Sequence, residues 1–263
     1  MRTGIFFTLL FLAMQCSFAQ SYSELCKEGE KQLENKEYKQ AAATFSRAGN
    51  AAKNKIERLY TLSNKGLAQS LMNNHEQAAE TFAQALAIEP TSPTLLLQRG
   101  NSLLQIDSVD SAVRCYNKIL EQLPDNRDAR FFRAYAYSLL GEHKESKLDY
   151  IKLISANSED KEARLGLAVL YQREGNINES LMMLETLIEE YPDEAEFYVA
   201  RCNLEREQGQ LELALQDINK AIEIEPQNAA HRTMQADVLQ QLGHEDAARR
   251  SRNIATKIST TTK

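Results

Sequence analysis

The prolines of this chain recur at a fixed interval. Four of the five are separated by multiples of 34 residues, and these four are Pro90, Pro124, Pro192 and Pro226. The vacant position of the series is Ser158. Proline ends a helix because it lacks a backbone N–H and its ring clashes with the preceding turn. The series therefore indicates one structural unit, copied several times, with a helix that ends close to the proline.

Other residue classes follow the same step of 34 residues. Small residues occupy two positions of the unit: Gly66, Gly100, Ala134, Ala168, Cys202 and Ala236 at the first, and Ala78, Ala112, Ser146, Ser180, Ala214 and Ala248 at the second. A third position is large and apolar: Phe82, Tyr116, Tyr150, Leu184 and Ile218. Small residues at regular helical positions predict close helix contacts, and the large residues predict a core between neighbouring units.

Each unit is predicted to be two helices joined by a tight turn. Apolar residues at helical spacing predict first helices over these ranges: 93–106, 127–140, 161–174 and 195–208. A turn-forming residue follows each one, and these residues are Asp107, Gly141, Gly175 and Gly209; Gly243 continues the series in the last copy. Glycine adopts the left-handed conformation of a helix C-terminal cap most easily. A second helix follows, for example 110–122 or 179–190, and ends near the proline.

The length of the unit, its small residues, the aromatic of its second helix and its terminal proline together resemble the tetratricopeptide repeat. This resemblance implies an all-α fold, a right-handed superhelical solenoid of helix-turn-helix repeats over residues 20–263. The full copies are 59–92, 93–126, 127–160, 161–194 and 195–228. Residues 22–58 resemble a divergent first copy with a three-residue insertion near Ile56, and 229–262 a capping copy. Arg252 stands in the capping copy where other copies carry a large apolar residue.

Residues 1–19 form a separate module. Arg2 precedes an apolar run over 5–14, and Ser17-Phe18-Ala19 has the small-x-small form of a signal-peptide cleavage site. We expect the mature chain to begin at Gln20 and to be exported. The end of this segment resembles the leaders of exported Bacteroidetes-like bacterial proteins, which implies the periplasm or the cell surface. Lipid anchoring through Cys16 is the alternative.

Composition restricts the partner class. The formal net charge is −6, and no basic stripe runs along the helices. Phosphate backbones are bound through clustered Lys and Arg, so nucleic acid is not expected as a partner. No segment after the leader is long and apolar enough to predict a transmembrane helix.

No catalytic constellation is predicted. The four histidines, His75, His143, His231 and His244, are expected in surface turns, too far apart to share a metal ion. Three cysteines follow the leader, Cys26, Cys115 and Cys202, and no internal disulfide is expected. No glycine-rich phosphate loop is present in the pattern. We therefore expect a protein that is not an enzyme and that has no cofactor and no metal.

In the family that the chain resembles, one face of each first helix lines a concave surface. Carried over to this sequence, that face predicts a partner-binding set: Leu97, Asn101, Leu104, Phe131, Tyr135, Leu139, Leu165 and Val169. Val199, Asn203 and Arg206 continue the same rows in the next copy. An apolar strip with a polar rim is typical of a protein-binding groove. The alternative is that these apolar residues simply pack between neighbouring helices.

The leading hypothesis is a non-enzymatic scaffold or adaptor of the bacterial cell envelope that binds a peptide or a partner helix in this groove. The alternative is a structural subunit of a larger envelope assembly or oligomer, which would associate through its convex face or its ends. An enzyme is the least favoured reading, because no acid, base, nucleophile or metal set converges.

Overall fold

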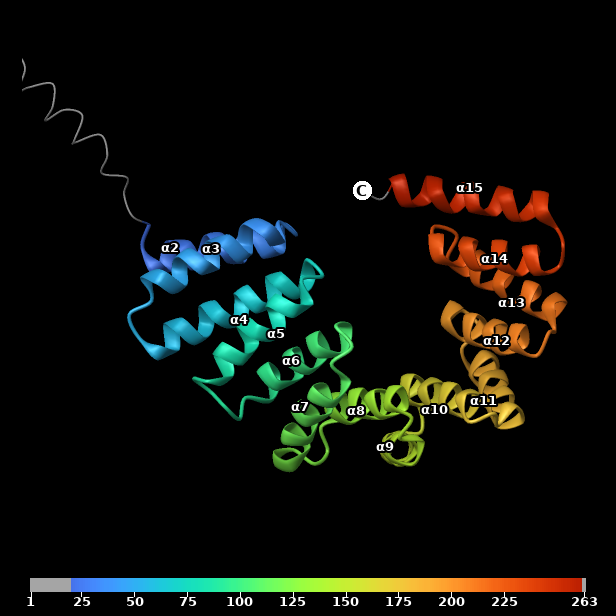
Figure 1. The fold of residues 1–263 in the computed structure, drawn as a ribbon, viewed down its shortest axis with the longest axis horizontal. Helices are drawn as coiled ribbons and strands as arrows, with labels where there is room; N and C mark the ends of the chain where they lie inside the picture. The colour runs from blue at the N-terminus through green and yellow to red at the C-terminus, as the bar shows by residue number, and fades with distance from the viewer. Residues whose placement is uncertain (1–19, 262–263) are drawn as a thin grey trace, which may run out of the picture. The chain divides into compact units, whose positions relative to one another are not determined.

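The computed structural model describes residues 20–261, so the predicted signal peptide lies outside the described range. Within that range every regular element is an α-helix, fourteen in all (Figure 1). The described residues form two compact units, and the division falls between Phe132 and Arg133, inside α8. The predicted all-α array of helix-turn-helix repeats is confirmed.

The first unit contains α2 to α7 and the start of α8. Their bounds are α2 (Tyr22–Glu34), α3 (Tyr38–Ala51), α4 (Lys55–Leu71), α5 (His75–Leu86), α6 (Pro93–Gln105), α7 (Val109–Gln122) and α8 (Arg127–Leu140). From α2 to α7, each helix packs against the one that follows it in the chain, and α4 also contacts α6. Such nearest-neighbour packing is the physical basis of a repeat array.

The second unit contains the rest of α8 and the remaining helices. Their bounds are α9 (His143–Ala156), α10 (Lys161–Arg173), α11 (Ile177–Glu190), α12 (Ala195–Glu207), α13 (Leu211–Ile224), α14 (Ala229–Gln241) and α15 (Glu245–Thr261). From α9 onward each helix again packs against its successor, as α14 and α15 illustrate in Figure 1. The first helices of two successive copies, α10 and α12, also touch.

The observed helix ends follow the predicted ones closely. The first helices of the middle copies end at Gln105, Leu140, Arg173 and Glu207. The insertion near Ile56 behaves differently from a loop. It lengthens α4 to 17 residues, against 13 for α6, and α4 begins at Lys55, before the expected start of the second copy at 59.

The turn between the two helices of a copy requires a left-handed backbone. Gly141, Gly175, Gly209 and Gly243 have φ between +72° and +82°. Asp107 occupies the same place with φ of 59°, and so do Asn73 and Lys36 in the two preceding copies, with φ of 59° and 62°. The sequence analysis did not include Asn73 or Lys36 among the turn-forming residues.

Small residues on the first helix of a copy make room for the large apolar residue of its second helix. A Cβ atom on Gly66 would lie 2.7 Å from Cε1 of Phe82, and one on Gly100 would lie 2.6 Å from Cε1 of Tyr116. The ring of Tyr116 also stacks on Phe132 of the next copy, with 6.1 Å between centroids. Tyr116 therefore packs within its own helix pair and also joins that pair to the following copy.

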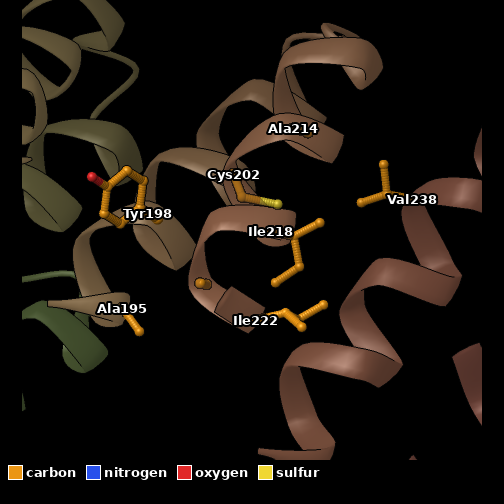
Figure 2. Close-up of a cluster of buried hydrophobic side chains, with 8 residues drawn as sticks. Ala195, Tyr198, Cys202, Ala214, Ile218, Ile222 and Val238 are labelled. Atoms are coloured by element: carbon orange, nitrogen blue, oxygen red, sulfur yellow. The ribbon is translucent and has the colours of Figure 1, made fainter. Parts of the chain in front are cut away.

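In the second unit the same positions build an aliphatic core. Figure 2 shows Cys202 of α12 pointing toward Ile218 of α13, while Val238 of α14 faces Ile218 from the neighbouring helix. All three side chains are fully buried. The cysteine therefore acts as a small packing residue. On α15, Arg252 is exposed and pairs with Asp237 at 3.1 Å.

Candidate functional site

The second unit carries a groove of about 700 Å³ over the first helices of two successive copies. It is lined mainly by α10 and α12, and Gln241 of α14 contributes one wall. Residues 165, 169 and 172 of α10 lie one helical turn apart, and residues 199, 203 and 206 repeat the spacing on α12. The 34-residue register brings the two rows side by side.

The floor of the groove is apolar and rests on the core. Leu165 belongs to a buried cluster with Leu184, Leu187 and Phe197, and Val169 and Ala200 pack against that cluster. Val199 packs against the neighbouring cluster around Ile218. Because the floor residues are packed against these two buried clusters, the groove is pre-formed, as ligand sites usually are.

Charged side chains form the rim. Arg173, Arg206, Glu196 and Glu207 line the groove. The Nε of Arg206 donates to Oε1 of Gln241 at 3.4 Å, which ties the rim of α12 to α14. Partial desolvation of the carboxylate, together with the charges of Glu162 and Glu194, raises the pKa of Glu196. The rim thus presents both signs of charge around an apolar centre.

Of the predicted site residues, Leu165 and Val169 line this groove. Tyr135 and Leu139 lie on α8 and are 43% and 39% exposed, outside the groove lining. Both belong to the second unit. Their exposure leaves apolar surface open on a first helix, and their role in partner binding stays a prediction.

The remaining four predicted residues belong to the first unit and do not line the groove. Leu97 and Leu104 are half-buried on α6. Asn101 accepts a hydrogen bond from the hydroxyl of Tyr116 at 2.8 Å, so its amide helps to close its own helix pair. Phe131 is half-buried, lies edge-on to Phe132, and has the guanidinium of Arg127 4.8 Å above its ring. These four side chains therefore spend much of their surface on contacts within the first unit.

Among residues 20–261, no group of three or more His, Cys, Asp or Glu could hold a metal ion. The cysteines Cys26, Cys115 and Cys202 are free and buried. His231 departs from the prediction of surface histidines, because it is only 8% exposed and its Nε2 lies 3.2 Å from Nδ2 of Asn228. None of the helices in the described range could cross a membrane.

The sequence pattern missed a polar pair within the copies. Arg133 binds Asp149 through two bonds of 2.7 and 2.8 Å, and Arg201 binds Asp217 with the same geometry. Both aspartates are buried. In each pair the aspartate follows the arginine by sixteen residues, and the second pair follows the first by 68 residues, which is two repeat lengths. A search for opposite charges at this spacing would have found both pairs.

Glu205 is buried beside the second of these pairs. Its side chain is 6% exposed in α12, one turn after Arg201, and its Oε2 has no hydrogen-bond partner. Burial raises the pKa of Glu205 to about 7, the negative charge of Asp217 adds to the rise, and Arg201 opposes it. Because Asp217 already holds the guanidinium with both oxygens, Glu205 is the carboxylate that takes up a proton.

Comparisons with known families agree with this architecture. Three family models, each described as a tetratricopeptide repeat, match residues 71–136, 128–160 and 165–229. The chain belongs to the tetratricopeptide repeat family. Proteins of this family are in general scaffolds for protein–protein interaction and not enzymes, and their partners are proteins or peptides.

Solved structures of other proteins share the fold, and tetratricopeptide repeat proteins are among them. One from Parabacteroides merdae is 22% identical with a TM-score of 0.81, covering 91% of this chain and 93% of its own. A thermophilic one from Thermus thermophilus is 19% identical with a TM-score of 0.62, covering 69% and 99%. Yeast Tom70 is 16% identical with a TM-score of 0.70, covering 85% of this chain and 48% of Tom70. At these identities the likeness extends to the fold alone.

The buried Glu205 predicts a pH-dependent stability. A folded pKa of about 7 lies above the ordinary value of about 4.3, so the folded state binds more protons between these values. The free energy of unfolding therefore falls as pH rises through this window and levels off above it. We expect Glu205→Gln to stabilise the tetratricopeptide repeat array by about 1–3 kcal/mol at pH 8, and to have little effect near pH 4. Urea unfolding followed by circular dichroism measures this difference.

The matched control is Glu207→Gln, two residues further along α12 and exposed. It should leave the pH dependence of the wild type in place. A Glu205→Gln protein no more stable than the wild type at pH 8 would contradict the assignment of Glu205 as the protonated carboxylate.

Proposed function

We propose that this tetratricopeptide repeat protein is a non-enzymatic adaptor of the bacterial cell envelope that holds an extended peptide or a partner helix in the groove over α10 and α12. The observation that carries the proposal is the apolar floor, which remains open to solvent at Val169 and Val199 while resting on two packed cores. Burial of apolar side chains against such a floor is the main source of binding free energy.

The repeat geometry suits an elongated partner. Val169 and Asn203 hold equivalent positions in successive copies, and so do Leu165 and Val199. A segment lying across α10 and α12 would therefore meet two apolar contacts, Leu165 and Val169, on α10. On α12 it would meet an apolar contact at Val199 and a polar one at Asn203. The amide of Asn203 offers a donor and an acceptor to a partner backbone.

The charged rim would set orientation more than affinity. Arg173 and Arg206 attract acidic groups, and Glu196 and Glu207 attract basic ones. Exposed charges at an interface mainly change the association rate and exclude mismatched partners. A partner segment with an apolar centre and mixed charges at its ends fits this arrangement best.

The groove predicts a specific loss of peptide binding. Peptides selected from a random library on the immobilised mature protein would be measured by fluorescence polarisation against a Val199→Asp variant. A carboxylate placed in the apolar floor must be desolvated when the peptide covers it, so we expect affinity to fall at least about ten-fold.

The control is Leu213→Asp, which changes a 46% exposed apolar residue of α13 that does not line the groove. It should bind as the wild type does. Equal affinity of the Val199→Asp protein and the wild type would reject the groove as the binding surface, provided that both proteins keep the same melting temperature.

A second candidate function is a structural subunit of an envelope assembly. Leu148 of α9 and Met182 of α11 are 67% and 68% exposed, and they hold the same position in two successive copies. Two large apolar side chains repeated on second helices favour contact with another protein surface.

This candidate predicts association of the mature protein with itself. Sedimentation velocity would then detect an oligomer that grows with concentration, and Leu148→Glu with Met182→Glu would return it to the monomer, because charges would have to be buried in the interface. Leu213→Asp again serves as the control. A wild-type protein that stays monomeric over the same concentrations would reject self-assembly through this face.

We also propose export to the periplasm, with the cell surface or a lipid anchor at Cys16 as alternatives. The support is the order of Arg2, the apolar run 5–14 and Ser17-Phe18-Ala19, all outside the described residues. Intact mass of the full-length gene product, recovered from the periplasmic fraction of a bacterial host, should correspond to a chain that begins at Gln20.

Ala19→Leu should block this cleavage, because signal peptidase sites require a small residue there. An uncleaved chain in the cytoplasm would contradict export. A lipid-modified chain beginning at Cys16 would contradict cleavage after Ala19 and identify the anchored form.

A further inference from the structure

A second, smaller cavity lies in the first unit, and none of its lining residues belongs to the groove. Its volume is about 190 Å³, and it is formed where α3 meets α4, with Gln84 of α5 at its edge. The lining on α4 includes Arg58, Thr61 and Lys65, which share one helix face. Three departures from the repeat pattern meet at this one place.

The first departure is Gly49, which opens the space. Its position on α3 corresponds to Leu86, Leu120 and Ile222 in other copies, and all three of those side chains are buried. Glycine leaves this volume unfilled. A Cβ atom on Gly49 would lie 3.2 Å from the hydroxyl oxygen of Thr61, so the backbone of α3 approaches the lining of α4 closely here.

The second departure leaves a cation without its usual partner. Lys65 holds the position of Arg133 and Arg201, and those arginines pair with an aspartate sixteen residues later. In this copy the residue at that place is Thr81, which donates its hydroxyl hydrogen to Oε1 of Gln69 instead. This copy therefore keeps the positive charge and lacks the carboxylate that pairs with Arg133 and Arg201. The next copy lacks it too, because Arg99 is followed sixteen residues later by Cys115.

The third departure adds another cation. Arg58 lies in the first turn of α4, the part of the helix that the insertion lengthens, and its place in the next copy is taken by Ser92, ahead of α6. Seven residues separate Arg58 from Lys65, so the two side chains project from the same face of α4, two turns apart. The extra turn thus brings an arginine to the cavity that other copies do not have.

The charges around the cavity favour an anion. Within residues 20–261 neither Arg58 nor Lys65 has a carboxylate within ion-pair distance, and no Asp or Glu lines the cavity. Gln84 at the edge of the cavity donates from Nε2 to Oε1 of Glu80 at 3.3 Å, and Glu80 itself does not line the cavity. The amide of Asn50 adds a further donor to the lining. In a chain with a net charge of −6, two unpaired cations at one cavity are a local reversal of sign.

We propose that the cavity between α3 and α4 is a binding site for a small oxyanion, held by Arg58 and Lys65. The guanidinium of Arg58 offers two parallel N–H donors, and Lys65 offers a mobile ammonium group. Phosphate and carboxylate groups present the same chemistry to these donors. Free phosphate and a carboxylate-bearing metabolite are the two sources that the test separates.

Binding is measured on the mature protein, residues 20–263, by melting temperature and by isothermal titration calorimetry. One arm contains sodium phosphate and the other sodium succinate, each against sodium chloride at equal ionic strength. With a Kd near about 1 mM, about 10 mM anion would favour the folded state about eleven-fold and raise the melting temperature by about 3–5 °C.

The double variant Arg58→Gln with Lys65→Gln should lose this rise and weaken binding at least about ten-fold, because both charge-assisted contacts are gone. The control Lys53→Gln with Lys55→Gln removes two exposed cations of the same segment that do not line the cavity, and it should keep the rise. Gly49→Leu restores the large residue of the other copies and should abolish binding by filling the space.

A rise with phosphate alone, succinate alone or both supports the site and identifies its anion. No rise with either anion in the wild-type protein overturns the proposal. A rise that persists unchanged in the Arg58→Gln, Lys65→Gln variant overturns it equally, because the anion would then act elsewhere on the chain.

Discussion

Close packing between a small residue on the first helix of a copy and a large apolar residue on the second is the contact on which the rest of the fold depends. Gly66 and Phe82 show it most directly, because no room exists for even one methyl group between them. The helices can then approach closely enough for the same ring to reach the next copy, as Tyr116 reaches Phe132. Burial of these rings supplies the main favourable free energy of a unit too short to form a core alone.

Different residue pairs form this small-to-large contact along the chain. Glycine faces an aromatic ring in the first copies, whereas Cys202 faces the smaller Ile218 in the second unit. Tyr150 is an intermediate case, since its ring lies against Gly166 of the following copy. A larger side chain on one helix is matched by a smaller one on the other, so the combined side-chain volume at each contact stays similar. Packed cores tolerate such volume-conserving exchanges best.

Departures from the repeat carry most of the individuality of this protein. Glu205 stands where a repeat would place an apolar residue, and it brings a protonated carboxylate into the core. Gly49 stands where Leu86 and Leu120 stand in later copies, and it leaves a cavity. A repeat array tolerates such local changes because each copy contacts only its neighbours, so a defect in one copy is not transmitted to the whole. A binding site can therefore form between two helices of one copy without destabilising the contacts between other copies.

The sequence alone determined the architecture, since periodic small, large and turn residues admit only one arrangement of helices, and the helix ends fell close to their expected places. The family resemblance also assigned Leu165 and Val169 to a first-helix surface, and helical spacing places them on one face of that helix. The sequence could not show that the groove extends to Gln241, that Asn101 accepts a hydrogen bond from Tyr116, or that His231 is buried. These features depend on side chains that the fold brings together from different helices. The pairing of Arg201 with Asp217 and the empty volume at Gly49 are likewise properties of packing in three dimensions. Sequence periodicity specifies where each residue lies in its copy, and only the tertiary structure decides which neighbour fills or leaves the space beside it.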